Sequence, residues 1–197
     1  MNDWQAILAA AVLAYLLGSI PFGLLLTRVA GLGDVRQIGS GNIGATNVLR
    51  TGNKGLAALT LLLDLAKGAA AVLLVARLFP GLEGLAALGV VLGHCFPVWL
   101  KFKGGKGVAT TAGVCFGIGW PIGLAYAVVW IGMLAITRIS SLGGLSAAVA
   151  APIAAFALGY SEAFPWLVAI SALVIWLHRA NIVRLKNGTE PRIGSKK

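Results

Sequence analysis

The chain alternates between long apolar runs and short breaks that are polar or contain glycine and proline. Because a helix needs about 20 apolar residues to cross a bilayer, these runs predict about seven transmembrane helices joined by short loops. The runs cover residues 4–27, 55–79, 84–100, 107–119, 121–137, 142–160 and 164–178. The fourth run is short and rich in glycine, so it also allows a half-span. We therefore expect an all-α integral membrane protein whose residues 1–197 form one polytopic membrane domain.

The composition excludes the other broad classes of protein. Hydrophobic residues make up 58% of the chain, charged residues only 11%, and the mean hydropathy is +0.89. Soluble domains carry about 25% charged residues, and disordered chains are poor in apolar residues. Cys95 and Cys115 fall in apolar stretches without a CxxC or Cys/His cluster, which indicates reduced packing residues. Because no length remains for a separate soluble domain, the chemistry must use loops and helix ends.

Basic residues gather on one side of the predicted membrane. The net charge is +10, and 14 of the 16 Lys and Arg residues lie in loops that seven spans would place on the same side. Those loops are residues 28–54, 101–106, 138–141 and 179–197. By the positive-inside rule this side is cytoplasmic, with the N-terminus exterior and the C-terminus cytoplasmic. The excess charge could serve orientation alone, so the other residues of these loops decide whether it does more.

The first basic loop holds the run GSGNIGATNVLR at residues 39–50. Glycines allow successive backbone N–H groups to turn inward as a nest for an anion, and the planar fork of Arg50 suits a phosphate. A glycine-rich turn between two helices is the alternative. A plain turn does not require so many hydroxyl and amide side chains, which favours an anion site.

The second basic loop reads KFKGGKGVAT at residues 101–110, and places lysines and glycines directly before a predicted helix. A helix N-terminus that follows glycine can bind an anion. The run is not a Walker A loop, because Lys106 is followed by Gly107 instead of Ser or Thr. The alternative is an ordinary positive-inside cluster, which leaves the interleaved glycines unexplained.

The third basic segment is the tail HRANIVRLKNGTE at residues 178–190. If the last helix continues through it, His178 and Asn181 share one face at i, i+3. They would then point together at the membrane surface. An amphipathic basic tail on anionic lipid is the alternative.

Several polar residues stand outside these three loops. Asp64 and Lys67 lie i, i+3 in an apolar run, where isolated charges are costly, so we expect them to pair as a structural ion pair or as the floor of a polar site. His94 is expected to be a core or interface residue. Ser140 and Ser141 begin the sixth run and, taken alone, indicate a helix cap.

Motifs for metal or covalent catalysis are absent from the sequence. It contains no HExxH zinc pattern, no GxSxG nucleophile elbow, and no histidine followed by aspartate with the HxxxxD spacing of thioester-dependent acyltransferases. Nothing in the sequence therefore resembles a covalent nucleophile with its base. Three basic or amide-rich loops on one face indicate two anionic groups held together at the interface, and a phosphate with an acyl chain fits best.

Three runs in order resemble the loop motifs of the bacterial acyl-phosphate-dependent glycerol-3-phosphate acyltransferases. They are SGNIGATNVLR at 40–50, GHCFPVWLKFKGGKGVAT at 93–110 and HRANIVRLKNGTE at 178–190, and the run DLAKG at 64–68 also matches. The resemblance covers nearly the whole chain. It implies transfer of an acyl group from acyl phosphate to the 1-hydroxyl of sn-glycerol 3-phosphate, giving lysophosphatidic acid and inorganic phosphate. It also implies a bacterial cytoplasmic membrane with the active site facing the cytoplasm.

The resemblance further implies site residues. Ser40 and its neighbouring glycines would hold the phosphate of the donor, while Arg50, Lys106, His178 and Asn181 would bind or orient glycerol phosphate and the leaving group. The remaining expected substrate-binding residues are Gly39, Gly41, Asn42, Thr46, Asn47, Lys103, Gly104, Gly105, Ser141 and Glu190. It implies membrane lipid as surroundings, no metal or cofactor, no nucleic acid and no obligate protein partner.

Two other functions stay open at this point. A transporter of a small phosphorylated solute would use similar residues, but its site should lie near the bilayer midplane, where only Asp64 and Lys67 are candidates. A noncatalytic membrane anchor would need the positive-inside charges alone. For the acyl transfer, either His178 or a phosphate oxygen of bound substrate could take the proton of the glycerol hydroxyl. We favour the phosphate, because no carboxylate close to His178 in sequence could orient it.

Overall fold

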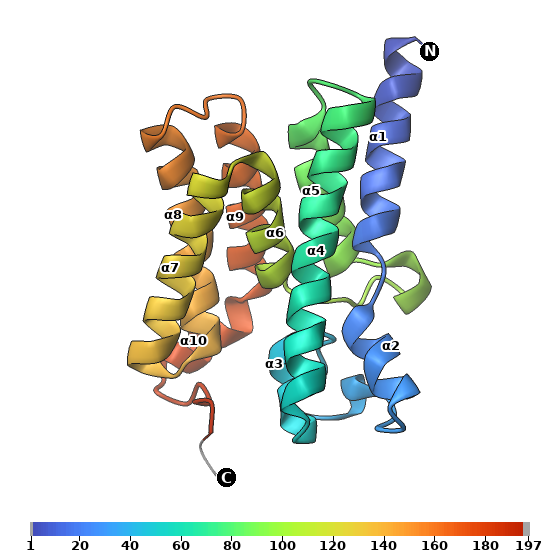
Figure 1. Ribbon diagram of the computed structural model, residues 1–197. Coiled ribbons are helices and arrows are strands. Elements are labelled where there is room, and N and C mark those ends of the chain that lie inside the picture. Colours follow the sequence, from blue (N-terminus) through green and yellow to red (C-terminus); the bar gives the residue numbers. More distant parts are fainter. Residues whose placement is uncertain (1, 195–197) are drawn as a thin grey trace.

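The chain folds into helices that run mostly along one direction (Figure 1). A computed structural model describes residues 2–194, and across these residues all regular structure is helical. The α-helices are α1 (Asp3–Gly18), α2 (Phe22–Val29), α3 (Ala45–Val48), α4 (Lys54–Leu78), α5 (Glu83–Cys95), α6 (Val108–Ile118), α7 (Trp120–Thr137), α8 (Ser140–Ala157), α9 (Phe164–Leu177) and α10 (Arg179–Lys186). Three short 3₁₀ helices are η1 (Val35–Gln37), η2 (Leu49–Thr51) and η3 (Val98–Leu100).

All seven predicted apolar runs are helical, but they differ in length. Five segments of the described chain are long and apolar enough to cross a membrane, or six if α9 and α10 are counted as one bent span. The shortest predicted run is α6, whose 11 residues reach only about 16 Å, which fits a half-span better than a full one. The protein is therefore an integral membrane protein with five or six helices of full spanning length.

Two predicted helices are interrupted by proline, which corrects the expected ranges 4–27 and 84–100. The first run is broken between the end of α1 at Gly18 and the start of α2 at Phe22, and Pro21 is the last residue of this break. The third stops at Cys95, two residues before Pro97, and resumes only as η3. Proline lacks the backbone N–H that a continuing helix needs, and it disfavours helical geometry in the residue before it.

Helix α6 lies between two groups of helices in Figure 1, with α1, α4 and α5 on one side and α7, α8 and α9 on the other. Its packing on α4 depends on glycine. A Cβ added at Gly68 of α4 would collide with the carbonyl of Thr110, and one at Gly113 of α6 would collide with the carbonyl of Leu65. Such small residues let two helix backbones approach closely, which is the usual basis of helix association in membranes.

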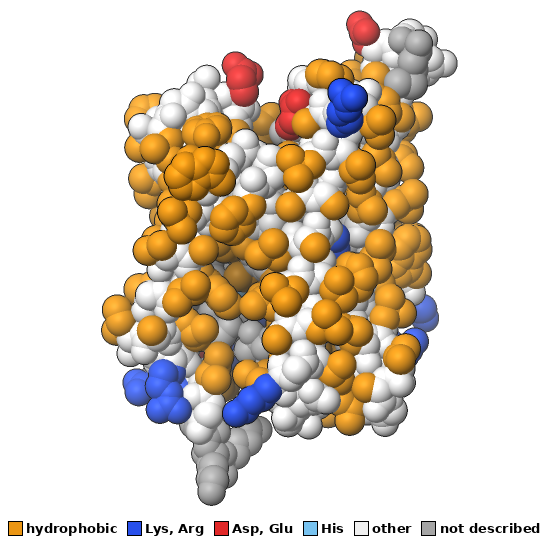
Figure 2. Space-filling view, in the orientation of Figure 1, with side chains coloured by type: hydrophobic (Ala, Val, Ile, Leu, Met, Phe, Trp, Pro, Cys, Tyr) orange, Lys and Arg blue, Asp and Glu red, His pale blue; other side chains and the backbone are white. Residues whose placement is uncertain are grey.

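Charge separates along the long axis of the molecule. On the face in Figure 2 the acidic side chains lie at the upper end and most Lys and Arg lie toward the lower end, while hydrophobic side chains cover the wall between them. The lower end carries α2, α3 and the C-terminal end, whereas the N-terminus lies at the upper end (Figure 1). Lys196 and Lys197, which belong to the predicted basic tail, lie outside the described residues.

The two charges predicted inside the second run pair as expected. Lys67 Nζ lies 2.6 Å from Asp64 Oδ1, and both side chains are only 3% exposed. Lys67 also donates a 2.8 Å hydrogen bond to the carbonyl of Ile20, within the break between α1 and α2. His94 is buried, as predicted, with its Nδ1 3.6 Å from the same carboxylate oxygen. This cluster ties α4 and α5 to the break in the first run.

Removing one partner of this pair should cost much stability. Asp64→Asn leaves the Lys67 ammonium buried without its counter-charge, so we expect a loss of about 3–5 kcal/mol in the free energy of unfolding. Replacing both residues, as Asp64→Leu with Lys67→Met, should recover most of that loss because no buried charge remains. Thermal unfolding of the purified variants in one detergent checks this. A double variant less stable than Asp64→Asn would contradict it.

Candidate active site

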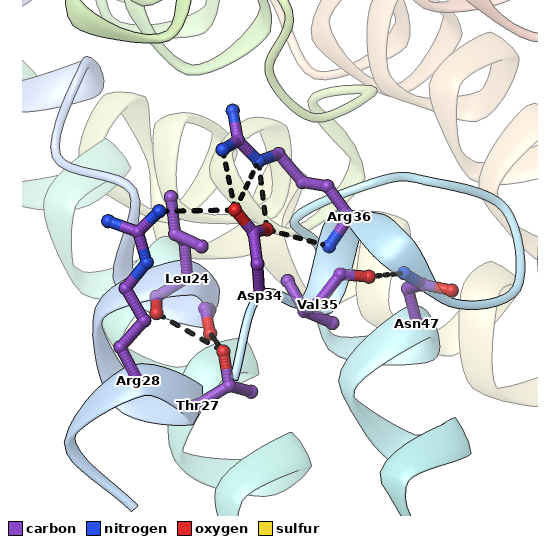
Figure 3. A network of polar contacts seen from close by, with 8 residues as sticks. Leu24, Thr27, Arg28, Asp34, Val35, Arg36 and Asn47 are labelled. Carbon is purple, nitrogen blue, oxygen red and sulfur yellow. Dashed lines mark hydrogen bonds and ion pairs between the residues drawn. The ribbon is translucent and has the colours of Figure 1, made fainter. Parts of the chain in front are cut away.

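The first basic loop is organised around one buried amide. Asn47 is 2% exposed, and its Nδ2 lies 2.8 Å from the carbonyl of Val35, 3.1 Å from that of Ile38 and 2.8 Å from that of Asn42. Its Oδ1 accepts a 3.1 Å bond from the backbone N–H of Ser40. Figure 3 shows the bond between Asn47 and Val35. Asn47 therefore shapes the loop, and its predicted role toward substrate would be exerted through Ser40.

The glycines of this loop adopt backbone conformations that other residues rarely reach. Gly39 has φ +55° and Gly41 has φ +68°. A Cβ at Gly39 would collide with the side chain of Arg50, so this glycine also makes room for the guanidinium. Asn42 Oδ1 accepts a 2.9 Å bond from the N–H of Gly44 and closes the turn. Ser40 and Arg50 are exposed. The backbone N–H groups of Ser40, Gly41 and Gly44 are all bonded within the loop, however, so these three are not the free donors that the predicted anion nest requires.

A buried glutamate joins the second and third basic segments. Glu190 Oε1 accepts hydrogen bonds from Ser141 Oγ at 2.7 Å and Asn181 Nδ2 at 2.6 Å, and Oε2 accepts from Arg184 Nε at 2.7 Å. Asn181 Oδ1 in turn accepts a hydrogen bond from Lys106 Nζ. Four predicted site residues, Ser141, Glu190, Lys106 and Asn181, are therefore in one connected network.

The charges of this network are set by burial and by their neighbours. Burial alone would raise the pKa of Glu190, but hydrogen bonds from Ser141, Asn181 and Arg184 outweigh it, so the pKa lies below its ordinary value. The pKa of Lys106 is lowered by burial and then by the nearby Arg184, against the opposing effect of Glu190, with Arg50 adding a smaller effect in the lowering direction. Lys106 therefore lies within electrostatic range of Arg50 in the first loop.

The first loop reaches this network through Ser140. Its Oγ lies 2.9 Å from Thr46 Oγ1, and the adjacent Ser141 bonds to Glu190. The expected cap is wrong, because α8 begins at Ser140 with Ile139 as its N-cap residue and no side-chain cap. The two hydroxyls instead bridge neighbouring segments, so all three basic segments meet at the start of α8.

The glycines of the second loop pack against the end of α5. The N–H groups of Gly104 and Gly105 donate 3.0 Å bonds to the carbonyls of Cys95 and His94. A Cβ at Gly105 would collide with the His94 ring. These two N–H groups are engaged within the protein and fix the loop directly before Lys106 against α5. Lys103 lies apart from Lys106 and lines a separate pocket, described below.

The third segment is bent at His178, which corrects the expected continuous helix. α9 and α10 meet at 60°, although neither proline nor glycine occurs there, and the sequence changes at this point from apolar to basic. His178 is the N-cap residue of α10, and its carbonyl accepts a 2.8 Å bond from the N–H of Ile182. His178 is 3% exposed, and its Nδ1 lies 2.8 Å from the carbonyl of Val174. Since a carbonyl only accepts, Nδ1 carries the proton and Nε2 of the neutral ring is an acceptor.

Sequence reasoning missed two residues of the network. Arg184 bonds to Glu190 across a turn, and Ser140 bonds to Thr46 from 94 positions away. Neither spacing follows a helical period, so no local pattern could indicate them. Among the described residues no group of three or more His, Cys, Asp or Glu is placed to hold a metal ion.

The fold and the site define a class of protein: an integral membrane protein whose loops gather cationic and amide groups at one end of the helices, where they suit a phosphorylated ligand. Comparison with known proteins narrows this class. The family model described as "Glycerol-3-phosphate acyltransferase" matches residues 8–188. The chain belongs to this glycerol-3-phosphate acyltransferase family, and its activity is accordingly an acyl transfer in lipid biosynthesis.

Relatives and solved structures agree over nearly the whole chain. A glycerol-3-phosphate acyltransferase of Erythrobacter litoralis is 68% identical over 187 residues, 95% of each chain, and one of Mesorhizobium japonicum is 60% identical over 190 residues, 96% of this chain and 97% of the relative. The glycerol 3-phosphate form of PlsY, an integral membrane glycerol 3-phosphate acyltransferase, has TM-score 0.90 at 40% identity, covering 95% of this chain and 96% of PlsY. The lysophosphatidic acid form of PlsY has TM-score 0.88 at 38% identity, covering 95% of each.

Proposed function

We propose that the acyl donor is a fatty acyl phosphate and that the products are lysophosphatidic acid and inorganic phosphate. The observation that carries this proposal is the Lys106–Asn181–Glu190 network, with Arg50 in electrostatic range. An acyl phosphate is a mixed anhydride with a good leaving group, so it needs positioning and charge stabilisation more than covalent catalysis. The PlsY forms with glycerol 3-phosphate and lysophosphatidic acid support the acceptor and the product.

In the proposed step, the 1-hydroxyl oxygen of glycerol 3-phosphate attacks the acyl carbon, and the bond from that carbon to the phosphate oxygen breaks. The phosphate leaves with the electron pair. The Ser40 hydroxyl, on the turn that Gly39 and Gly41 allow, would hold the donor phosphate, while Arg50 and Lys106 would stabilise the negative charge that develops on it. Asn181, Ser141 and Glu190 would keep Lys106 oriented, and Asn42, Thr46, Asn47, Gly104 and Gly105 would shape the loops around both substrates.

The proton of the glycerol hydroxyl would go to a phosphate oxygen of a bound substrate. His178 has an unprotonated Nε2 that can orient the hydroxyl, but its Nδ1 bonds to a backbone carbonyl and not to a carboxylate. We therefore expect His178→Gln to retain measurable turnover, with a loss of about 100-fold or less. Single-turnover rates measured at saturating concentrations of both substrates check this. Complete loss of chemistry with both substrates bound at normal affinity would make His178 the base.

The donor is tested by measuring phosphate release from purified protein in detergent with palmitoyl phosphate and glycerol 3-phosphate, and with palmitoyl-CoA as the rival donor. Release that requires both palmitoyl phosphate and glycerol 3-phosphate supports the proposal. Lysophosphatidic acid formed from palmitoyl-CoA, or silence with palmitoyl phosphate, contradicts it. Turnover without added metal or nucleotide is also expected.

We also propose that residues 1–197 act as one domain in the bacterial cytoplasmic membrane, without an obligate protein partner. The short helix α6 and the loop before it would together complete the seventh crossing. The N-terminus would be exterior, and the three basic segments would face the cytoplasm, because basic loops stay on that side. The native cysteines, Cys95 and Cys115, are buried and should not react with a maleimide added from outside. In whole cells an impermeant maleimide should label Glu162→Cys and leave Lys186→Cys unlabelled until the membrane is opened. The reverse pattern would invert the topology.

A further inference from the structure

A second cluster of cations surrounds a cavity outside the Lys106 network. The cavity has a volume of about 400 Å³. It is lined by Arg28, Arg36, Trp99, Leu100, Lys101 and Lys103. Arg28 belongs to α2, Arg36 to the loop that follows it, and the other residues to the segment after α5. None of the Lys106, Asn181 and Glu190 side chains lines it, so this cavity is distinct from the site described above.

One carboxylate holds both arginines in place. Asp34 accepts bonds from Arg36 Nε at 2.9 Å and Nη2 at 2.6 Å, and from Arg28 Nη2 at 3.1 Å (Figure 3). The two guanidinium groups are fixed by this shared partner and keep further N–H groups free to donate. Their side chains are 55% and 33% exposed, so both remain accessible to a ligand.

The two lysines are presented by an unusual turn. Lys101 has φ +52° and Phe102 has φ +59°, a left-handed conformation that costs energy for residues other than glycine. The turn is closed by 3.1 Å bonds from Phe102 N–H to the carbonyl of Pro97 and from Lys103 N–H to that of Leu100. Neither lysine forms a salt bridge within residues 2–194. The cluster has four cations, Arg28, Arg36, Lys101 and Lys103, and among the described residues Asp34 is the carboxylate bonded to it. The net charge around the cavity is therefore +3.

The cavity also borders apolar surface. Trp99 is 50% exposed while its indole Nε1 donates a 2.6 Å bond to the carbonyl of Ser19. Phe102 is 58% exposed, and Val29 at the end of α2 is 89% exposed. An indole fixed at such a boundary, with cations on one side and apolar side chains on the other, is typical of the interface between lipid and water. A ligand that combines a phosphate with an acyl chain matches both surfaces.

We propose that this cavity is a second phosphate site, which binds the terminal phosphate of a single-chain acyl lipid at the membrane interface. A terminal phosphate carries about two negative charges, whereas the phosphodiester of a bulk phospholipid carries one, and the net charge of +3 favours the former. The inference rests on the proposed function, since the acyl phosphate donor and the lysophosphatidic acid product both have such a phosphate. Arg36 lies in the loop segment that Asn47 ties to Ser40, so the cavity would receive or release these lipids beside the reacting groups.

The test measures how many molecules of hexadecyl phosphate the purified protein binds in an uncharged detergent, by native mass spectrometry. This probe cannot transfer its chain, so binding is read independently of turnover. Wild type should bind two molecules. The double variant Lys101→Gln with Lys103→Gln should lower the affinity for one of these molecules by about 10-fold or more and leave the affinity for the other unchanged. Lys54→Gln with Lys186→Gln removes the same charge from exposed positions outside the cavity and should leave both unchanged.

Further arms separate the sources of the phosphate. The double variant Arg50→Gln with Lys106→Gln should weaken binding of the other hexadecyl phosphate molecule, the one that the Lys101→Gln with Lys103→Gln variant still binds normally. Phosphatidylglycerol and inorganic phosphate should compete about 10-fold or more weakly than hexadecyl phosphate at the second site. The inference would be overturned if wild type bound only one molecule, or if the Lys54 with Lys186 control lost as much affinity as the Lys101 with Lys103 variant. It would also be overturned if phosphatidylglycerol or inorganic phosphate competed as well as hexadecyl phosphate. Two-site binding by a protein that fails to turn over acyl phosphate would count against the proposed function alone.

Discussion

Lys106→Gln is expected to lower kcat/KM for acyl transfer by about 1,000-fold, the size of effect seen when one preorganised donor to a developing negative charge is removed. The Lys106 ammonium is partly buried, is held by Asn181 and lies within electrostatic range of Arg50. No other described lysine shares this network. The rate of phosphate release from palmitoyl phosphate and glycerol 3-phosphate measures the loss.

Lys54→Gln is the matched control for this variant. Lys54 is exposed at the start of α4, on the same end of the molecule, and lies outside the network. We expect it to keep wild-type rates, and both variants should unfold at nearly the wild-type temperature. Near-normal turnover by Lys106→Gln, or an equal loss in Lys54→Gln, would show that the lysine serves only the general positive charge of the loop.

Glu190→Gln should have the second largest effect, because one carboxylate connects α8, α10 and, through Asn181, the second loop. The amide keeps the shape but removes the charge that Arg184 pairs with, and it offers one acceptor oxygen in place of two. We expect about 100-fold lower turnover and a loss of about 2–3 kcal/mol in the free energy of unfolding, the size expected for a charged hydrogen-bond partner. Turnover and thermal unfolding at neutral pH measure both effects.

The pH dependence of the same variant separates this role from a general loss of packing. Because the pKa of Glu190 is lower in the folded protein, its stabilisation is fully present above the ordinary carboxyl pKa of 4.5 and is lost as the pH falls through the folded value. The difference in unfolding temperature between wild type and Glu190→Gln should therefore shrink toward acid. Glu162→Gln, at an exposed position, should show no such difference at any pH. A gap for Glu190→Gln that stays constant into acid would contradict the charged network.

The helices were largely predictable because their signal is local. Each apolar run is helical, and the i, i+3 spacing of Asp64 and Lys67 correctly predicted their pairing. The breaks at Pro21 and Pro97 were also present in the sequence, but continuous hydrophobicity masked them. The bend at His178 has no local breaker, so it could not be predicted from residue types.

The arrangement of the site was predictable only in part. The three basic segments were assigned to one end from the positive-inside pattern, and their hydrogen bonds do connect them. How they connect depends on distant pairs such as Thr46 with Ser140, which no spacing rule relates. Lys103 and Lys106 are three positions apart, and yet Lys103 lines the second cavity while Lys106 bonds to Asn181. The two glycines between them are bonded to the carbonyls at the end of α5, a long-range contact that no local pattern indicates.

The most direct test of the proposed reaction follows the oxygen of the acceptor. Glycerol 3-phosphate labelled with ¹⁸O in its 1-hydroxyl is mixed with palmitoyl phosphate and purified protein. The ¹⁸O content of lysophosphatidic acid and of the released phosphate is then measured by mass spectrometry. Attack on the acyl carbon predicts that the label stays in the ester of lysophosphatidic acid and that the released phosphate is unlabelled, with one phosphate formed for each lysophosphatidic acid. Label absent from the ester, or phosphate released without lysophosphatidic acid, would contradict acyl transfer from acyl phosphate at this site.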